Sequence, residues 1–247
     1  MDTRCDECGY AREDYRSAID QKWLQSVIET RVQLMFEDLS EGAVIVGFGD
    51  ADTLLTKLTR LAQVEDLHPA VHFTRAAARA SAAMVPRPYA VSGRLAEINV
   101  SLGGVPKQPV GESGVSWRGV VGDKHHDMKN HGHSWQALCI WSVDVLSALQ
   151  LEGHPINSGN AGENLTVRGL DWKRMRTGVR FQIADVVCEL TAPAVPCNNN
   201  APWFLDGNYK RMSHTLNPGW SRWYASVLRP GTVRPGDDVR VVAPVSP

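Results

Sequence analysis

The feature that most constrains the fold is a change in sequence character at Pro86 and Pro88. Before these prolines, apolar residues recur at helical spacing and one stretch is rich in alanine. After them, β-branched runs punctuated by glycine and proline prevail, and seven of the eight tryptophans lie at Trp117 or later. The change predicts a helical N-terminal region over residues 1–84 and a mostly β domain over residues 85–247.

Short β-branched or alternating runs predict the strands of the second region, at 94–100, 135–141, 163–167, 179–183, 186–190, 223–228 and 239–242. Ser142 is a plausible N-cap for one helix, which Gly153 can end. Because helices do not alternate with the strands, a closed or nearly closed barrel is favoured over a doubly wound sheet. The predicted fold class is therefore α+β, a distorted and mostly β barrel preceded by a small helical segment.

Composition limits the functional classes. The chain of 247 residues has a formal net charge of -1, which argues against a general binder of nucleic acid or membrane surfaces. No apolar run approaches the roughly 20 residues of a transmembrane helix, and the polar, acidic N-terminus does not resemble a secretory signal. Five scattered cysteines do not form a disulfide pattern. We expect a reduced, cytoplasmic protein.

A single thiol stands out at the end of one predicted strand. Residues 186–190 are apolar and β-branched, and Pro193 and Pro196 are expected to stop the strand because neither has an amide donor. Cys197 follows on this proline-stiffened loop, which suits a reactive group held on a rigid scaffold. A buried, inert cysteine is the alternative, and Cys188, inside the strand, fits that alternative better.

Four of the eight histidines lie in a polar loop over residues 122–134. Their spacing matches no usual zinc pattern. Lysine, imidazolium and amides freed by glycine would instead suit a phosphate or an acidic ring system. A solvated loop remains the alternative. The candidate residues of this loop are Asp123, Lys124, His125, His131 and Gly132.

A second polar loop, GNAGENL, contains Gly162, which permits close backbone approach, and Glu163 and Asn164, which offer an acceptor and an amide. A tight turn explains this loop equally well. The basic cluster beyond it includes Arg180. Near the N-terminus, Cys5 and Cys8 form half of a zinc site, and a metal-free terminus is the better interpretation.

The order and spacing of these loops resemble one family. The matching segments are GVPKQPV, GVVGDKHHD, HGHSWQALCIWS, GNAGENLTVRGLDW, GVRFQIADVVCEL, PCNN, LNPGWSRWYASVL and GTVRPGDDVRV. Together they resemble the MOSC family, named for the C-terminal domain of molybdenum cofactor sulfurase, over about residues 88–245. Residues 1–84 are outside this resemblance. They are faintly similar to part of the DinB-like helical bundles, which bind metal through histidines, and here His68 and His72 have a metal-capable spacing.

The MOSC resemblance implies a barrel whose pocket holds the molybdenum cofactor, a pyranopterin dithiolene bearing a phosphate. It implies that Cys197 ligates the metal, that Glu163 and Asn164 shape the pocket, and that His131 and Gly132 lie near the pterin or its phosphate. The remaining expected cofactor contacts are Lys124, His125, Gly162, Asn198 and Arg180. Family-level descriptions also associate such domains with pyridoxal phosphate binding.

Two functions remain open on this basis. The first is a reductase of N-hydroxylated or related small substrates, with electrons from an external donor protein and protons relayed by Glu163, Asp123 or His131. The second is a non-catalytic carrier of cofactor or sulfur that uses Cys197 as a persulfide or transfer thiol. A barrel that binds some other anion is a third interpretation. Residues 1–84 could cover the barrel mouth or form a homodimer.

Overall fold

The computed structural model describes residues 92–126, 131–132, 134–176 and 178–242. The predicted N-terminal helices, the Cys5–Cys8 pair and the His68–His72 pair lie outside these residues, as does the predicted boundary at Pro86 and Pro88. These predictions therefore remain untested.

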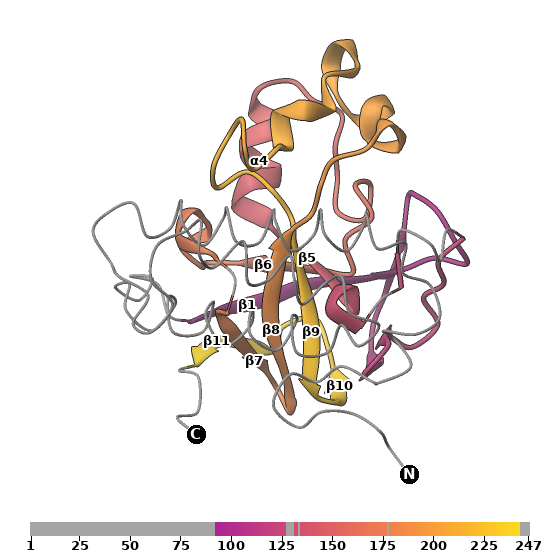
Figure 1. The fold of residues 1–247 in the computed structure, drawn as a ribbon, viewed down its shortest axis with the longest axis vertical. Coiled ribbons are helices and arrows are strands. Elements are labelled where there is room, and N and C mark those ends of the chain that lie inside the picture. The colour runs from indigo at the N-terminus through magenta and orange to yellow at the C-terminus, as the bar shows by residue number, and fades with distance from the viewer. Residues whose placement is uncertain (1–91, 127–130, 133, 177, 243–247) are drawn as a thin grey trace, which may run out of the picture. The chain divides into compact units, whose positions relative to one another are not determined.

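Seven strands close into a mixed barrel (Figure 1). Around the ring they are β1 (Ser92–Val100), β6 (Leu165–Arg168), β5 (Leu138–Ser142), β9 (Trp223–Arg229), β8 (Val186–Pro193), β7 (Arg180–Ile183) and β11 (Asp238–Val242). Pairing of β1 with β11 closes the ring, and β5 and β6 are its parallel pair. The expectation of a mostly β barrel is thus confirmed.

Strand β1 closes the barrel because it pairs with two barrel strands, β11 and β6. Its first residues, Ser92 to Arg94, pair with β11, while Arg94 to Ile98 pair with β6 across a register shift between Leu95 and Glu97. Its last residues pair with β2 (Gln108–Val110). Such an irregularity bends a strand and increases its twist. The largest fully buried side chains among the described residues are Leu95, Ile98, Leu138, Ile140, Trp141, Phe181 and Trp223.

A second, smaller sheet consists of β10 (Gly231–Val233), β3 (Ser113–Ser116) and β4 (Gly119–Val120). The sequence did not predict these strands or β2, because runs of two to four residues are too short to show a period. The predicted strand at 135–141 was partly wrong, since η2 (Ser134–Gln136) is a 3₁₀ helix. Strand β8 also runs through Pro193 instead of stopping before it.

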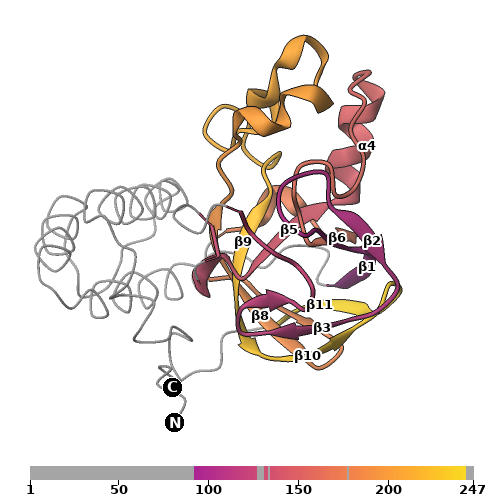
Figure 2. The ribbon, with the colours of Figure 1, turned by 90° about the vertical axis from the view of Figure 1, so that its right-hand side faces the viewer.

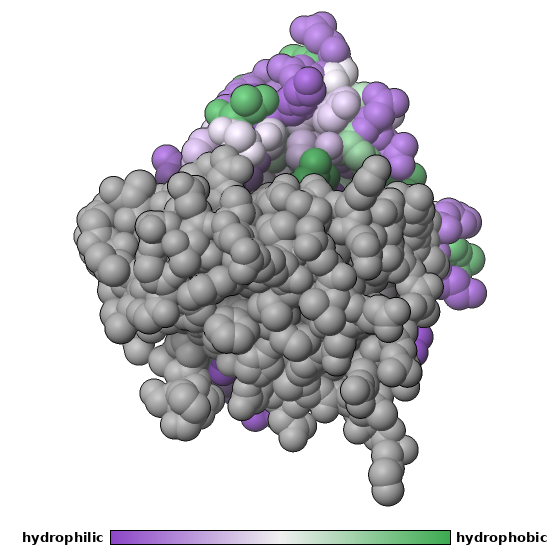
Figure 3. Space-filling model, in the orientation of Figure 1, coloured by the Kyte–Doolittle hydropathy of each residue, from purple (hydrophilic) through white to green (hydrophobic). Residues whose placement is uncertain are grey.

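One end of the barrel carries helical segments (Figures 1 and 2). Helix α4 (Val143–Leu151) begins at the predicted N-cap, where the Ser142 side chain accepts a bond from the Asp144 amide. The 3₁₀ helices η4 (Asn198–Trp203), η5 (Leu205–Gly207) and η6 (Tyr209–Met212) connect β8 to β9. Arg211 joins them to α4 through Glu152, at 2.6 Å. In Figure 3 the visible surface of this end mixes hydrophilic and hydrophobic residues.

Among the described residues, the structure contains no helix that is both long and apolar enough to cross a bilayer. This finding agrees with the absence of a long apolar run in the sequence.

Candidate functional site

A cavity of about 210 Å³ lies where the β1–β2 connection, the histidine loop, the loop before β6 and the loop after β8 meet. Its volume is below the range of roughly 300–1,000 Å³ common for drug-sized ligands, so it suits a small molecule or one end of a larger group. Its lining is Gly104, Val105, Lys107, Lys124, His125, His126, His131, Gly132, Gln136, Cys139, Ala161, Gly162, Asn164, Val195, Cys197, Asn199, Asn200, Arg222 and Tyr224.

Cys197 lies in the cavity wall with an exposed side chain. It is the N-cap residue of η4, and its backbone amide donates to the Asn200 side-chain oxygen at 3.2 Å. The Asn200 amide in turn donates to the Cys197 carbonyl at 3.0 Å. These reciprocal bonds fix the loop without engaging the sulfur strongly, because the contact from Sγ to Asn200 is 3.9 Å. The thiol therefore remains available to a ligand.

The carbonyl of Ala161 ties three parts of the site together. It accepts a bond from the Asn200 side chain at 3.3 Å and another from the Arg222 guanidinium. Asn200 belongs to the Cys197 loop, Ala161 to the loop before β6, and Arg222 lies just before β9. The Ala161 carbonyl oxygen thus connects three segments of the chain next to the Cys197 loop.

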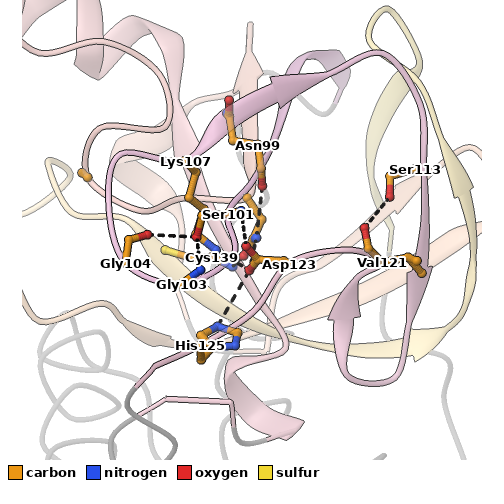
Figure 4. Close-up of polar contacts among 12 residues, drawn as sticks. Asn99, Ser101, Gly103, Gly104, Lys107, Ser113, Val121, Asp123, His125 and Cys139 are labelled. Carbon is orange, nitrogen blue, oxygen red and sulfur yellow. Dashed lines mark hydrogen bonds and ion pairs between the residues drawn. The ribbon is translucent and has the colours of Figure 1, made fainter.

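Asp123 is the centre of a buried polar network (Figure 4). Its carboxylate forms an ion pair with Lys107, and accepts bonds from the Asn164 side chain at 2.9 Å and the Ser101 amide at 2.8 Å. The side chains of Asp123 and Lys107 are only 4% and 6% exposed. Since its oxygens are engaged by these donors, Asp123 positions the cavity wall and is poorly placed to exchange protons with a ligand.

Two imidazoles lie together at the cavity. The rings of His125 and His131 are stacked with centroids 6.2 Å apart. Burial, followed by the charge of Lys107, lowers the pKa of His125, while Asp123 opposes the shift from 3.9 Å. His125 is therefore mainly neutral at pH 7 and can accept a proton as well as donate one.

Glu163 is fully buried beside the cavity but does not line it. Its Oε1 accepts the Gly159 amide at 2.7 Å, while Oε2 is buried without a partner. Burial raises the pKa of this carboxyl from 4.5 to about 7, against the opposing effect of backbone hydrogen bonds and Arg222. Glu163 thus fixes the turn at Gly159, and a proton on its free oxygen reduces the cost of burial.

This shift predicts a pH-dependent stability. Between pH 4.5 and 7 the folded chain retains a proton that unfolded Glu163 releases, so the free energy of unfolding should fall by about 3 kcal/mol as the pH rises through this window. Urea titrations should show that the free energy of unfolding of the wild type falls across this window, whereas that of Glu163→Gln changes less with pH. The difference between the two proteins should shrink accordingly. Glu112→Gln, an exposed control, should follow the wild type; parallel curves for all three would contradict the assignment.

The structure brings together most of the candidate residues found in the sequence. Lys124, His125, His131, Gly132, Gly162, Asn164 and Cys197 line the cavity. Asp123 and Glu163 support its wall without lining it. Two candidates lie elsewhere: Arg180 is paired with Glu189 at 2.9 Å between β7 and β8, and Asn198 is outside the lining while Asn199 and Asn200 are part of it.

The structure adds Lys107, Gln136, Cys139, Arg222 and Tyr224, which sequence analysis missed. All five lie inside segments quoted for the family resemblance, but no local pattern marks them as lining residues. Cys139 is a protonated thiol at neutral pH, because burial raises its pKa to about 11. Cys188 is buried away from the cavity with a pKa raised to about 12, which confirms its interpretation as inert.

Among the described residues, no three histidine, cysteine or carboxylate side chains gather into a metal-binding group. A metal held at Cys197 would need its other ligands from elsewhere, as a dithiolene cofactor provides them.

Comparison with known proteins connects this arrangement to one family. Residues 127–240 match the family model of the MOSC domain. The uncharacterized protein YflK of Bacillus subtilis is 27% identical over 142 residues, which is 57% of this chain and 63% of YflK. The match therefore spans less than two thirds of that relative.

Solved structures also resemble the chain. One, described only as a hypothetical protein, has a TM-score of 0.50 at 21% identity and covers 62% of this chain and 70% of its own. YiiM from Geobacillus stearothermophilus has a TM-score of 0.49 at 23% identity and covers 61% and 75%. The first likeness shows a shared fold.

Proposed function

We propose that this chain, whose residues 127–240 match the family model of the MOSC domain, binds the molybdenum cofactor generally linked to that family, with Cys197 as the metal ligand. The observation that carries the proposal is the exposed Cys197 thiol in the wall of the cavity. Thiolate is a soft ligand suited to such a metal. Asn200 holds the loop through the Cys197 backbone and accepts only a long contact, 3.9 Å, from the sulfur.

The rest of the lining suits an anionic, hydrogen-bonding group. Arg222 and Lys124 contribute positive charge, and the amides of Asn164 and Asn199 offer donors and acceptors. The Nε of Arg222 and the Oε1 of Gln136 are buried without partners, so both remain available. The cavity volume accommodates the metal-bearing end of a pyranopterin more readily than the whole group.

The reaction proposed is reduction of an N-hydroxylated or related small substrate. When bound, the cofactor supplies two-electron oxygen-atom chemistry. Reduction breaks the N–O bond, consumes two electrons and two protons, and releases the amine and water. His125 and His131 line the cavity and are placed to deliver protons, whereas Asp123 and Glu163 lie behind its wall. The five cysteines include no ferredoxin-like run, so we assign the electrons to an external donor protein.

A second function, a carrier of sulfur or cofactor, is supported by the same exposure of Cys197, because an exposed thiol is accessible to a partner protein. Pyridoxal phosphate has less support. Lys107 is buried and held in an ion pair with Asp123, so its amine is already engaged and is not free to form a Schiff base.

The proposal is tested by metal and pterin analysis of protein made in cells that build the cofactor. We expect stoichiometric molybdenum in the wild type and a loss of at least tenfold in Cys197→Ser, because the hydroxyl is a hard, weak ligand. Cys188→Ser, a buried cysteine outside the cavity, is the control and should retain molybdenum if it folds. Full retention by Cys197→Ser would refute the ligand assignment. Turnover of an N-hydroxylated base by reduced protein would then select the enzyme over the carrier.

A further inference from the structure

Arg222 is a buried cation without a counter-charge among the described residues. It is 6% exposed, and it lines the cavity. One guanidinium nitrogen donates to the Ala161 carbonyl, while Nε has no partner. No described carboxylate lies within ion-pair distance of it. An unpaired buried charge costs several kcal/mol, so such a site favours a ligand that supplies negative charge.

The acids close to the cavity do not cancel this charge. Asp123 is already committed to Lys107. Glu163 acts on Arg222 electrostatically, but burial raises the pKa of its carboxyl to about 7, so a large fraction of it is neutral near that pH. Lys124 adds a further cation to the lining. Within the described part of the chain, the cavity therefore carries an excess of positive charge.

Arg222 also lies close to the thiols. Its guanidinium interacts electrostatically with both Cys139 and Cys197, and it shares the Ala161 carbonyl with Asn200 of the Cys197 loop. The negative charge that it favours would thus be placed beside the proposed metal ligand, where the reacting part of a substrate lies.

The side-chain oxygen of Gln136 is a second unpaired group, and it further defines the ligand that the cavity would bind. Gln136 is buried, lines the cavity and leaves its side-chain carbonyl oxygen without a partner. An unpaired buried acceptor costs roughly 1–3 kcal/mol, which a ligand N–H or O–H would recover. A substrate that satisfies both residues carries an anionic oxygen for Arg222 and a donor hydrogen for Gln136.

We propose that this cavity selects acidic N-oxygenated substrates, such as N-hydroxylated carboxylic acids, over cationic ones such as amidinium compounds. The inference rests on the proposed function for the reaction, but the charge preference of the cavity can be measured without turnover. It narrows the substrate class, because N-hydroxylated compounds include neutral, acidic and basic members.

The test uses three planar ligands of nearly equal shape: benzoate, benzamide and benzamidinium, with charges of minus one, zero and plus one. Isothermal titration of the full chain at pH 6.5, where most of Glu163 is neutral, should rank benzoate at least about tenfold tighter than benzamide, as expected for one charge-assisted hydrogen bond in a buried site. Benzamidinium should bind weakest. Equal or tighter binding of benzamidinium would overturn the inference.

Substitutions of Arg222 test whether this residue causes the preference for benzoate. Arg222→Met should abolish the advantage of benzoate over benzamide, and Arg222→Lys should retain part of it. Arg240→Met, an exposed arginine on β11 outside the cavity, is the control and should bind like the wild type. Unchanged selectivity in Arg222→Met would refute the assignment, and the wild-type ranking decides the question even if that variant does not fold.

The two proposals fail separately. Protein that lacks molybdenum yet prefers benzoate would refute the proposed function and leave the charge preference standing. Protein that contains molybdenum but shows no preference among the three ligands would refute only the inference about substrate charge.

Discussion

Replacing Asp123 with alanine should reduce the free energy of unfolding by about 3–5 kcal/mol, which is the usual cost of leaving one member of a buried ion pair uncompensated. Lys107 would lose its ion-pair partner in a wall where its side chain is only 6% exposed. The Asn164 side chain and the Ser101 amide would lose their acceptor at the same time. Guanidinium or urea titration of purified protein measures the loss.

Two comparisons separate this explanation from a general loss of charge. Asp238→Ala removes an exposed pair with Arg94 and should cost less than about 1 kcal/mol. The double variant Asp123→Ala with Lys107→Met should be more stable than Asp123→Ala alone, because it removes the stranded ammonium group. If the double variant is instead less stable than either single variant, the ion pair is not the source of the effect.

Trp141→Ala should destabilise the barrel by about 3–5 kcal/mol, because the side chain is fully buried and its removal leaves a large cavity. Trp141 lies on β5, next to the parallel strand β6. Its indole N–H donates to the Trp220 carbonyl at 3.1 Å, which connects the barrel to the segment before β9. Loss of this residue therefore disturbs both the core and the position of Arg222.

Thermal or chemical unfolding measures this loss. Trp141→Phe should cost less, since it keeps most of the apolar volume and removes the hydrogen bond. Leu151→Ala, at the end of α4 and 90% exposed, should change the stability by no more than about 0.5 kcal/mol. Similar costs for Trp141→Ala and Leu151→Ala would show that Trp141 is not part of the stabilising core.

Much of the site was predictable because its residues lie in local patterns. The strand before Cys197, the glycine of the GENL turn and the histidine loop each have a sequence signature, and all three meet at the cavity. The Ser142 N-cap was predicted for the same reason, since capping depends on neighbouring residues. The family resemblance added the order of these loops and the expectation of a barrel.

Other features required the assembled barrel. Arg180 belongs to a basic cluster in the sequence, yet strand pairing places it opposite Glu189, where it completes an ion pair away from the cavity. Arg222 has no motif of its own, and its role follows only from the Ala161 carbonyl and the missing counter-charge. Burial likewise decides the protonation of Glu163.

The sequence by itself determined which segments become the barrel strands and which loops carry thiol, imidazole and amide groups, because periodicity, proline and glycine act over a few residues. Only the tertiary structure decided which charges are paired and which remain unpaired. That outcome depends on strand register and on contacts between residues far apart in the sequence, such as Arg222 and Ala161, which are 61 positions apart, and no local pattern encodes it.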